Sequence, residues 1–213
     1  MRFVLASTSP ARAALLRQAG IAPELRAPGV DEDALVAERE AARGAALHPA
    51  ELVEVLAHAK ALAVAEPLAS AVTEPCLVFG GDSAFEFDGV VHGKPHTPER
   101  ARERWLAHNG KTGVLWSGHA LVRLSPGEPL RVVHRVASAR VTFAELSEAE
   151  IDAYIDSGEP LEVAGAFTVD SLGGPFIRHV EGDPSTVVGL SLSTLRELAL
   201  ELDVPWTSLW RLV

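Results

Sequence analysis

The sequence contains a single cysteine, Cys76, among its 213 residues. One cysteine can form neither an internal disulfide nor a cysteine-rich metal site, and within an apolar run it is most simply a small hydrophobic residue of a buried strand. No stretch approaches the roughly 18 uninterrupted apolar residues of a membrane span. The N-terminus also lacks the basic, apolar and small-residue segments of a signal peptide. We therefore expect a cytoplasmic protein without a membrane partner.

Positive charge is scarce as well. The 19 Lys and Arg residues are outnumbered by 29 Asp and Glu residues, which gives a net charge of −10. Proteins that bind long nucleic acids neutralise many phosphates with Lys and Arg side chains, so the negative net charge argues against a nucleic-acid partner. A small phosphorylated ligand needs only a few cations in one pocket, and the net charge does not exclude one.

Several common catalytic motifs are absent from the sequence. It has no Walker A sequence, no G-x-S-x-G and no cysteine–histidine nucleophile pair. His92 and His96 have the spacing of a helical metal site, but Pro95 between them excludes a regular helix. The usual kinase, serine-hydrolase and thiol mechanisms therefore lack their signatures.

The hydrophobic pattern alternates between strand-like and helix-like segments. Some predicted strands are joined by hairpins and others are followed by helices, which predicts one mixed α/β sheet. A chain of this length with 47% hydrophobic residues can form a single domain over residues 1–213. The expected strands are 2–6, 76–79, 84–87, 90–92, 114–124, 132–143, 164–169 and 176–180, and the expected helices are 10–19, 51–66, 97–107, 147–157 and 193–202.

The segment after the first strand suits a phosphate. Ser9 is a natural N-cap and Pro10 fits the first helical turn. A helix N-terminus offers unpaired N–H groups, the hydroxyls of Ser7 and Ser9 add hydrogen-bond donors, and Arg12 adds a positively charged guanidinium group. The plainer alternative is an ordinary capped helix with a solvated arginine.

Asp82 follows a probable central strand and two glycines, where open α/β sheets tend to place their sites. Asp88-Gly89 predicts a tight hairpin, whose register, if continued, brings Lys94 diagonally beside Asp82. A carboxylate next to a cation suits a phosphate-handling site. The alternatives are a turn-forming aspartate and a structural ion pair.

Asp31-Glu32-Asp33 is a run of three carboxylates. Such hard oxygen ligands could help to hold Mg²⁺ or Mn²⁺. A solvated loop or a helix start is the alternative.

Taken in order, these segments resemble the Maf-like family of nucleotide pyrophosphatases over roughly residues 3–202. The match needs several separate segments in one order, which makes it specific. They are Leu5-Ala6-Ser7-Thr8-Ser9-Pro10-Ala11-Arg12, Val30-Asp31-Glu32, Ala57-His58-Ala59-Lys60-Ala61, Gly81-Asp82-Ser83, Gly93-Lys94-Pro95, the segment from Tyr154 to Pro160, Ala164-Gly165-Ala166-Phe167, Glu181-Gly182-Asp183 and Val187-Val188-Gly189-Leu190.

The resemblance implies an elongated mixed β-sheet with flanking helices, two lobes around a cleft and a relation to inosine triphosphate pyrophosphatases, often as a homodimer. It implies cleavage of a nucleoside triphosphate between its α- and β-phosphates with a divalent cation, Mg²⁺ or Mn²⁺. Asp82 matches the general base and metal ligand, and Glu32 the second acidic position. The phosphate-binding positions correspond to Ser7, Ser9, Arg12, Lys60 and Lys94.

Three positions that the resemblance links to base selectivity disagree. Ala11 stands where the family commonly has a basic or aromatic residue. Ser83 resembles the threonine of the dTTP/UTP branch, whereas Asp170 resembles the glutamate of the 7-methyl-GTP branch. A pyrimidine such as dTTP or UTP and a modified nucleotide therefore both stay open as substrates.

Two other functions are alternatives for this set of residues. An inosine or xanthosine triphosphate pyrophosphatase would share the fold and reaction but act on purines. A non-catalytic nucleotide-binding regulator of cell division would not need a base beside its phosphate site. The intact set of Asp82, Lys94, Lys60 and Glu32 disfavours the regulator.

Overall fold

The computed structural model describes residues 1–211, which form two compact units. The first unit contains residues 1–82, 117–137 and the described residues from Gly189 onward, and the second contains residues 83–116 and 138–188. A single domain over residues 1–213 stays a prediction.

The strands form a mixed sheet, as the hydrophobic pattern predicts. Strand β1 pairs in parallel with β2 and β3, whereas β4 pairs antiparallel with β3 and β7 antiparallel with β6. The order is β2-β1-β3-β5-β6-β7, with β4 on β3. The strands are β1 (Arg2–Ala6), β2 (Glu24–Leu25), β3 (Cys76–Phe87), β4 (Val90–His92), β5 (Thr112–Leu124), β6 (Arg131–Phe143) and β7 (Ile177–Glu181).

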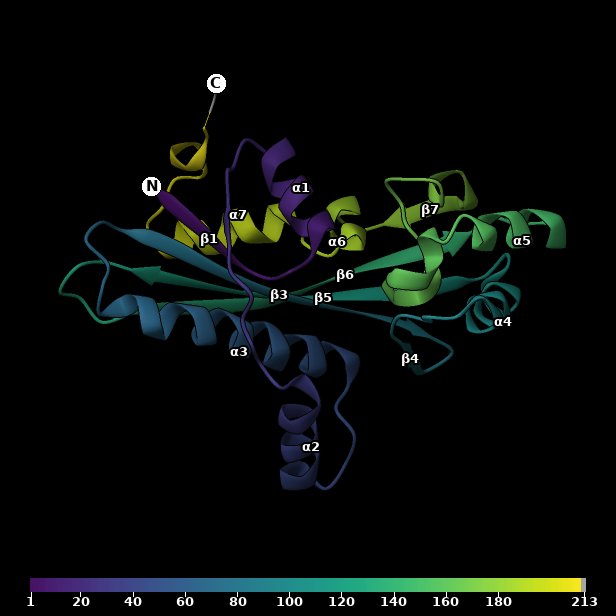
Figure 1. Ribbon diagram of the computed structural model, residues 1–213, viewed down its shortest axis with the longest axis horizontal. Coiled ribbons are helices and arrows are strands. Elements are labelled where there is room, and N and C mark those ends of the chain that lie inside the picture. The colour runs from purple at the N-terminus through teal and green to yellow at the C-terminus, as the bar shows by residue number, and fades with distance from the viewer. Residues whose placement is uncertain (212–213) are drawn as a thin grey trace. The chain divides into compact units, whose positions relative to one another are not determined.

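The first unit has helices on both faces of its strands. Helix α3 (Pro49–Ala69) covers one face, and α1 (Pro10–Gln18) and α7 (Leu192–Glu201) cover the other (Figure 1). Alternate residues of β1 enter separate cores, because successive strand side chains point to opposite faces. Phe3 and Leu5 pack with α1 and α7, whereas Val4 and Ala6 pack with α3. Helix α2 (Glu32–Arg43) buries no residue.

The second unit is built around aromatic side chains. Trp105 of α4 (Pro98–His108) packs against Phe143 of β6 and Tyr154 of α5 (Glu148–Asp156). His108 lies in the same core and is fully buried, and neither of its ring nitrogens has a hydrogen-bond partner among residues 1–211. The remaining elements are α6 (Pro184–Val188) in this unit, its short 3-10 helices Glu159–Glu162, Ala164–Ala166 and Gly174–Phe176, and Trp206–Leu209 of the first unit.

Local signals predicted the helix starts well. Ser9 is the N-cap of α1, as predicted, and Thr97 and Ser147 cap the helices predicted to start at these two residues; all three side chains accept from backbone N–H groups. Helix α3 is longer than predicted at both ends. It begins after a capping box at His48, and it runs through Pro67 to Ala69, although a proline there forgoes one backbone hydrogen bond to the preceding turn.

The predicted strand at 164–169 is wrong. Gly165 and Ala166 have φ values of 73° and 63°, in the left-handed region that no strand uses. The Ala166 carbonyl accepts a 2.7 Å hydrogen bond from Trp105 Nε1 instead of joining the sheet. The apolar run is therefore buried as an irregular segment.

None of the helices in residues 1–211 has both the length and the apolar character to cross a membrane.

Candidate active site

The turn between β1 and α1 fixes three of the predicted side chains. Ser7 Oγ accepts from the Ser9 backbone N–H at 3.1 Å and from Arg12 Nη1 at 3.3 Å. Ser9 Oγ accepts from the Arg12 backbone N–H at 3.3 Å and caps the helix. Two hydroxyls and one guanidinium thus gather at the N-terminus of α1, where the helix dipole favours an anion.

Arg12 is a buried cation, not the solvated arginine of the plainer alternative. Its Nε donates a 2.7 Å hydrogen bond to the carbonyl of Gly189. Burial lowers the pKa of Arg12, while the nearby charges of Asp82 and Glu32 raise it. An arginine stays protonated even so, and its buried charge is compensated by the two carboxylates.

Lys60 joins these two carboxylates. Its Nζ lies 2.6 Å from Asp82 Oδ1 and 2.8 Å from Glu32 Oε1. The Lys60 side chain is only 9% exposed, so it is taken out of water along the core boundary with its ammonium paired twice. Glu32, Lys60 and Asp82 come from α2, α3 and β3, so the cluster depends on tertiary packing.

Gly80 explains how Lys60 reaches Asp82. A Cβ atom at Gly80 would lie 2.4 Å from the carbonyl oxygen of Ala57 on α3. Only a glycine allows the strand to approach the helix backbone this closely. Lys60 follows Ala57 by about one turn of α3. The close contact between α3 and β3 at Gly80 therefore places the Lys60 side chain at the end of the buried part of β3. The missing side chain at Gly80 thus makes room for the backbone of α3.

The surroundings of Asp82 change the pKa of its carboxyl group in both directions. Burial raises its pKa, the charges of Lys60 and Arg12 lower it in part, and Glu32 raises it further; the net direction is upward. A carboxylate with a raised pKa is a better proton acceptor than a solvated aspartate while it remains ionised.

Lys94 is not the partner of Asp82 that the hairpin register suggested. Phe87 does face Val90, as predicted, but the ladder ends at the pair Phe85 and His92. The continuation that would place Lys94 beside Asp82 is therefore wrong. Lys94 Nζ instead lies 3.8 Å from Glu162 Oε2, with both side chains more than half exposed. Such an exposed, long ion pair holds the lysine only weakly.

The remaining predicted residues occupy different positions. Ala11 is exposed on α1, and Asp170 is exposed in the second unit. Ser83 follows Asp82 along β3 and is half-buried. Of the acidic run, Asp31 caps α2 by accepting from the Ala34 N–H at 3.0 Å, so Glu32 alone joins Lys60.

A model of the Maf-like protein family matches residues 2–202. The chain belongs to the Maf-like family. It is 61% identical, over 99% of its length and 97% of the relative's, to a nucleoside triphosphate pyrophosphatase of Leifsonia xyli subsp. xyli. It is 48% identical to the protein of the same name from Salinispora tropica, over 99% of this chain and 88% of that one. The family resemblance read from the motifs is confirmed.

Among solved structures, the Maf-like chain is similar to the Staphylococcus aureus Ham1 protein with a TM-score of 0.36 and 12% identity, over 95% of each chain. A likeness this weak carries no conclusion about either protein's activity.

The Gly189 carbonyl is the site group that sequence reasoning missed. It belongs to a motif segment of the Maf-like family, yet its role as acceptor for Arg12 comes from the backbone, which carries no side-chain signal. Gly189 has a φ of 107°, which favours glycine, and a glycine in such a segment is the one available hint.

The described part of this Maf-like chain contains no group of three or more His, Cys, Asp or Glu residues arranged to hold a metal. It does contain the carboxylate pair of Glu32 and Asp82, each bound to Lys60 through one oxygen. Within residues 1–211, Glu32 Oε2 and Asp82 Oδ2 make no hydrogen bond or ion pair. One or two carboxylates plus substrate phosphates are the usual ligands of Mg²⁺, so this donor set fits such an ion.

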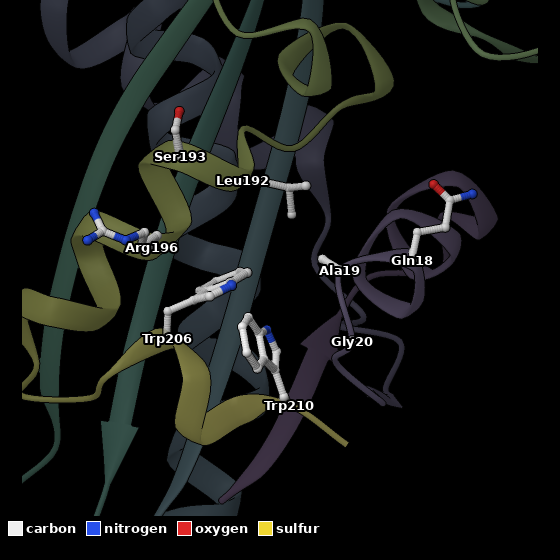
Figure 2. A pocket seen from close by; sticks show the side chains of 8 residues that line it. All are labelled: Gln18, Ala19, Gly20, Leu192, Ser193, Arg196, Trp206 and Trp210. Carbon is white, nitrogen blue, oxygen red and sulfur yellow. The ribbon is translucent and has the colours of Figure 1, made fainter. Parts of the chain in front are cut away.

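A pocket of about 510 Å³ lies at the other end of α1 and contains none of the predicted site residues. Figure 2 shows Trp206 and Trp210 side by side in this pocket, with Leu192 and Ala19 across from them. Its walls are largely apolar, with Arg196 as the single charged lining residue. The predicted phosphate-binding residues Ser7, Ser9 and Arg12 lie at the N-terminal end of α1 and do not line this pocket.

Proposed function

We propose that this chain hydrolyses a nucleoside triphosphate to the monophosphate and pyrophosphate. The observation that carries the proposal is the cluster in which the buried cations Arg12 and Lys60 meet the carboxylates of Glu32 and Asp82, beside the hydroxyls of the β1–α1 turn. It combines anion-binding donors with a carboxylate of raised pKa. The names of the two Maf-like relatives support the same activity.

In the proposed reaction, Asp82 accepts a proton from a water molecule whose oxygen bonds to the α-phosphorus. The bond between that phosphorus and the bridging oxygen to the β-phosphate breaks, and pyrophosphate leaves with the electron pair. Negative charge grows on the phosphate oxygens, so pre-placed cations lower the barrier. Arg12 and Lys60 supply that charge, and Ser7 and Ser9 donate hydrogen bonds to phosphate oxygens.

Lys94 is proposed as a further phosphate-binding cation. Its side chain is 53% exposed, and its ion pair with Glu162 is long, so exchanging this partner for a phosphate costs little. The flexible four-carbon stem of a lysine suits such a contact.

Glu32 and Asp82 are proposed to hold a divalent cation, Mg²⁺ or Mn²⁺, through the oxygens that Lys60 does not use. When bound, the ion would neutralise phosphate charge at the reacting centre. Lys60 keeps both carboxylates oriented before the ion and the substrate arrive.

The substrate proposal is a pyrimidine triphosphate such as dTTP or UTP, which Ser83 favours, against a modified nucleotide, which Asp170 favours. Ala11 leaves out a large side chain and is compatible with either base. We further propose a cytoplasmic homodimer without a nucleic-acid partner, consistent with the net charge of −10.

A release assay on the full-length protein tests the proposed function. The panel comprises dTTP, UTP, CTP, 7-methyl-GTP and ITP, each with Mg²⁺, with Mn²⁺ or with a chelator, and products are identified as pyrophosphate or phosphate. The proposal expects metal-dependent pyrophosphate and the monophosphate from at least one nucleotide. Preference for ITP would favour the inosine triphosphate pyrophosphatase, and tight nucleotide binding without any cleavage would favour the regulator.

A further inference from the structure

His119 lies within β5 and is completely buried in the first unit. Its Nε2 accepts a 2.8 Å hydrogen bond from the backbone N–H of Ser191, and its Nδ1 lies 3.3 Å from the carbonyl oxygen of Arg135 on β6. A ring nitrogen that accepts from an N–H carries no proton, whereas a carbonyl oxygen can only accept. The two contacts therefore define His119 as a neutral imidazole with its proton on Nδ1.

The contact with Ser191 restrains the segment that leads into α7. Ser191 is the N-cap of this helix, and its Oγ accepts from the Thr194 N–H at 3.1 Å. The preceding residue, Leu190, is fully buried in the core that contains residues of α1 and α7. His119 thus ties the peptide group between Leu190 and Ser191 to β5, at a point where the core and the helix cap fix the neighbouring side chains.

The peptide group on the other side of Leu190 carries the Gly189 carbonyl. This carbonyl accepts the 2.7 Å hydrogen bond from Arg12 Nε. Gly189 has a φ of 107°, and a glycine permits so many backbone conformations that it does not itself fix the direction of its carbonyl. That direction is set by the residues that follow, through Leu190 in the core and Ser191 on His119.

Arg12 depends on this carbonyl for its orientation. Its Nη1 donates to Ser7 Oγ at 3.3 Å, a longer contact than the one from Nε to Gly189. Because a guanidinium is planar and rigid, contacts at Nε and at Nη1 together define the plane in which it lies. Arg12, His119, Gly189 and Ser191 all belong to the first unit, so this chain of contacts lies within one compact body.

We propose that His119 is a positioning residue for Arg12: by accepting from the Ser191 N–H it fixes the Gly189 carbonyl, and this carbonyl orients the guanidinium for the phosphates. The inference rests on the proposed function and deepens it, because it names what prepares one of the cations before the substrate binds. Cations stabilise a transition state most when they are held in place in advance. His119 itself contacts no phosphate and transfers no proton.

Two amide substitutions of His119 form a matched pair. The Asn side chain in His119→Asn reaches only as far as Nδ1, so it can still donate to the Arg135 carbonyl but leaves the Ser191 N–H without its acceptor. The longer Gln side chain in His119→Gln brings an amide oxygen to the place of Nε2 and can accept from Ser191. Each variant therefore replaces the ring with an amide and keeps one of its two hydrogen bonds.

The pyrophosphate release assay separates the two variants. We expect His119→Asn to lower kcat/KM for the best nucleotide about tenfold, the effect of losing roughly one hydrogen bond, and His119→Gln to stay within about threefold of wild type. Equal losses in the two variants would overturn the positioning role, because a histidine that only fills the core is disturbed by either amide. An unchanged rate in His119→Asn would overturn it as well.

A double-mutant cycle shows whether the effect passes through Arg12. Arg12→Met removes the guanidinium and its contact with Gly189 but leaves a flexible apolar side chain at this buried position. In that background we expect His119→Asn to change kcat/KM by less than about twofold, because two changes that remove the same interaction are not additive. A full tenfold loss on top of Arg12→Met would overturn the proposal.

NMR of the side-chain nitrogens needs neither turnover nor a folded variant for its first result. In wild type, the nitrogen shifts of His119 should show a neutral ring protonated at Nδ1, and a proton on Nε2 would overturn the inference. The Arg12 Nε–H should exchange with water about tenfold faster in His119→Asn than in wild type or His119→Gln, and unchanged exchange would also overturn it. Wild-type protein that gives these signals but cleaves no nucleotide would overturn the proposed function and not the link between His119 and Arg12.

Discussion

Lys60 Nζ donates to Asp82 Oδ1 across 2.6 Å, and the lysine side chain is 9% and the aspartate side chain 15% exposed. This pair links a cation, suited to phosphate, with the carboxylate assigned to proton transfer. Both groups are withdrawn from water, and the charge of Lys60 lowers the pKa of Asp82 against the larger effect of burial.

Lys60→Met should move the acid limb of the pH profile. The Lys60 charge lowers the pKa of Asp82 against the effect of burial, so its removal raises that pKa further. Activity depends on ionised Asp82, so the acid limb of kcat/KM should shift to higher pH. Lys60→Arg keeps the charge and should shift the limb less. An unmoved acid limb in Lys60→Met would contradict Asp82 as the titrating base.

Lys94→Ala should weaken binding of the triphosphate. We expect KM to rise about tenfold with kcat within about threefold of wild type, because a phosphate contact made equally in the ground and transition states affects binding alone. Lys111→Ala is the control, since Lys111 is an exposed lysine of the same unit that lies over the ring of Phe87. Equal effects of the two changes would remove Lys94 from the site.

Local and long-range features differ in how well the sequence predicts them. The cap at Ser9 and the hairpin pair of Phe87 and Val90 follow from neighbouring residues, and both were predicted correctly. The pairing of Lys60 with Asp82 depends on how closely α3 packs on β3, which no local pattern encodes. The hairpin therefore pointed to Lys94, although its ladder stops at His92.

The wrong prediction of a strand at residues 164–169 has a similar cause. Its apolar composition fits a buried strand, and its burial is real, since Ala166 and Phe167 belong to the core of the second unit. The Ala166 carbonyl instead accepts from Trp105 Nε1, 61 positions away in the sequence, and Thr168 Oγ1 donates to Glu159. A local pattern does not encode the first of these contacts.

Gly80→Ala should disrupt the site through the fold. The added Cβ would meet the Ala57 carbonyl at 2.4 Å, so α3 must move away from β3 and carry Lys60 with it. We expect a destabilisation of ~1–3 kcal/mol together with lost activity. Gly93→Ala is the control, because nothing lies within 4 Å of its added Cβ. Denaturant unfolding measures the difference, and a fully active, equally stable Gly80→Ala would contradict the close-packing account.

His108→Leu should remove an acid sensitivity of the second unit. Burial first, then the charges of His92, Arg104 and Lys111, lower the pKa of His108 from 6.5 to about 3. The folded protein thus binds fewer protons than the unfolded chain between these values, and stability falls as pH drops below 6.5. At pH 5 the loss amounts to about 2 kcal/mol, since each pH unit is worth roughly 1.4 kcal/mol.

Urea unfolding at pH 5 and pH 8 measures this effect. His108→Leu should lose less stability between the two pH values than wild type, while His179→Gln, a change at an exposed histidine, should behave like wild type. The same pH dependence in wild type and His108→Leu would show that His108 does not titrate in this way.

The central claim is that Asp82 is the base for hydrolysis, and Asp82→Asn tests it most directly because the amide keeps the size of the side chain but accepts no proton. The measurement is the rate of pyrophosphate release with the best nucleotide of the panel, alongside the unfolding midpoint. The account predicts a rate at least about 100-fold lower with a folded protein of unchanged or higher midpoint, because a buried charge is removed. A folded Asp82→Asn variant that turns over at the wild-type rate would contradict it.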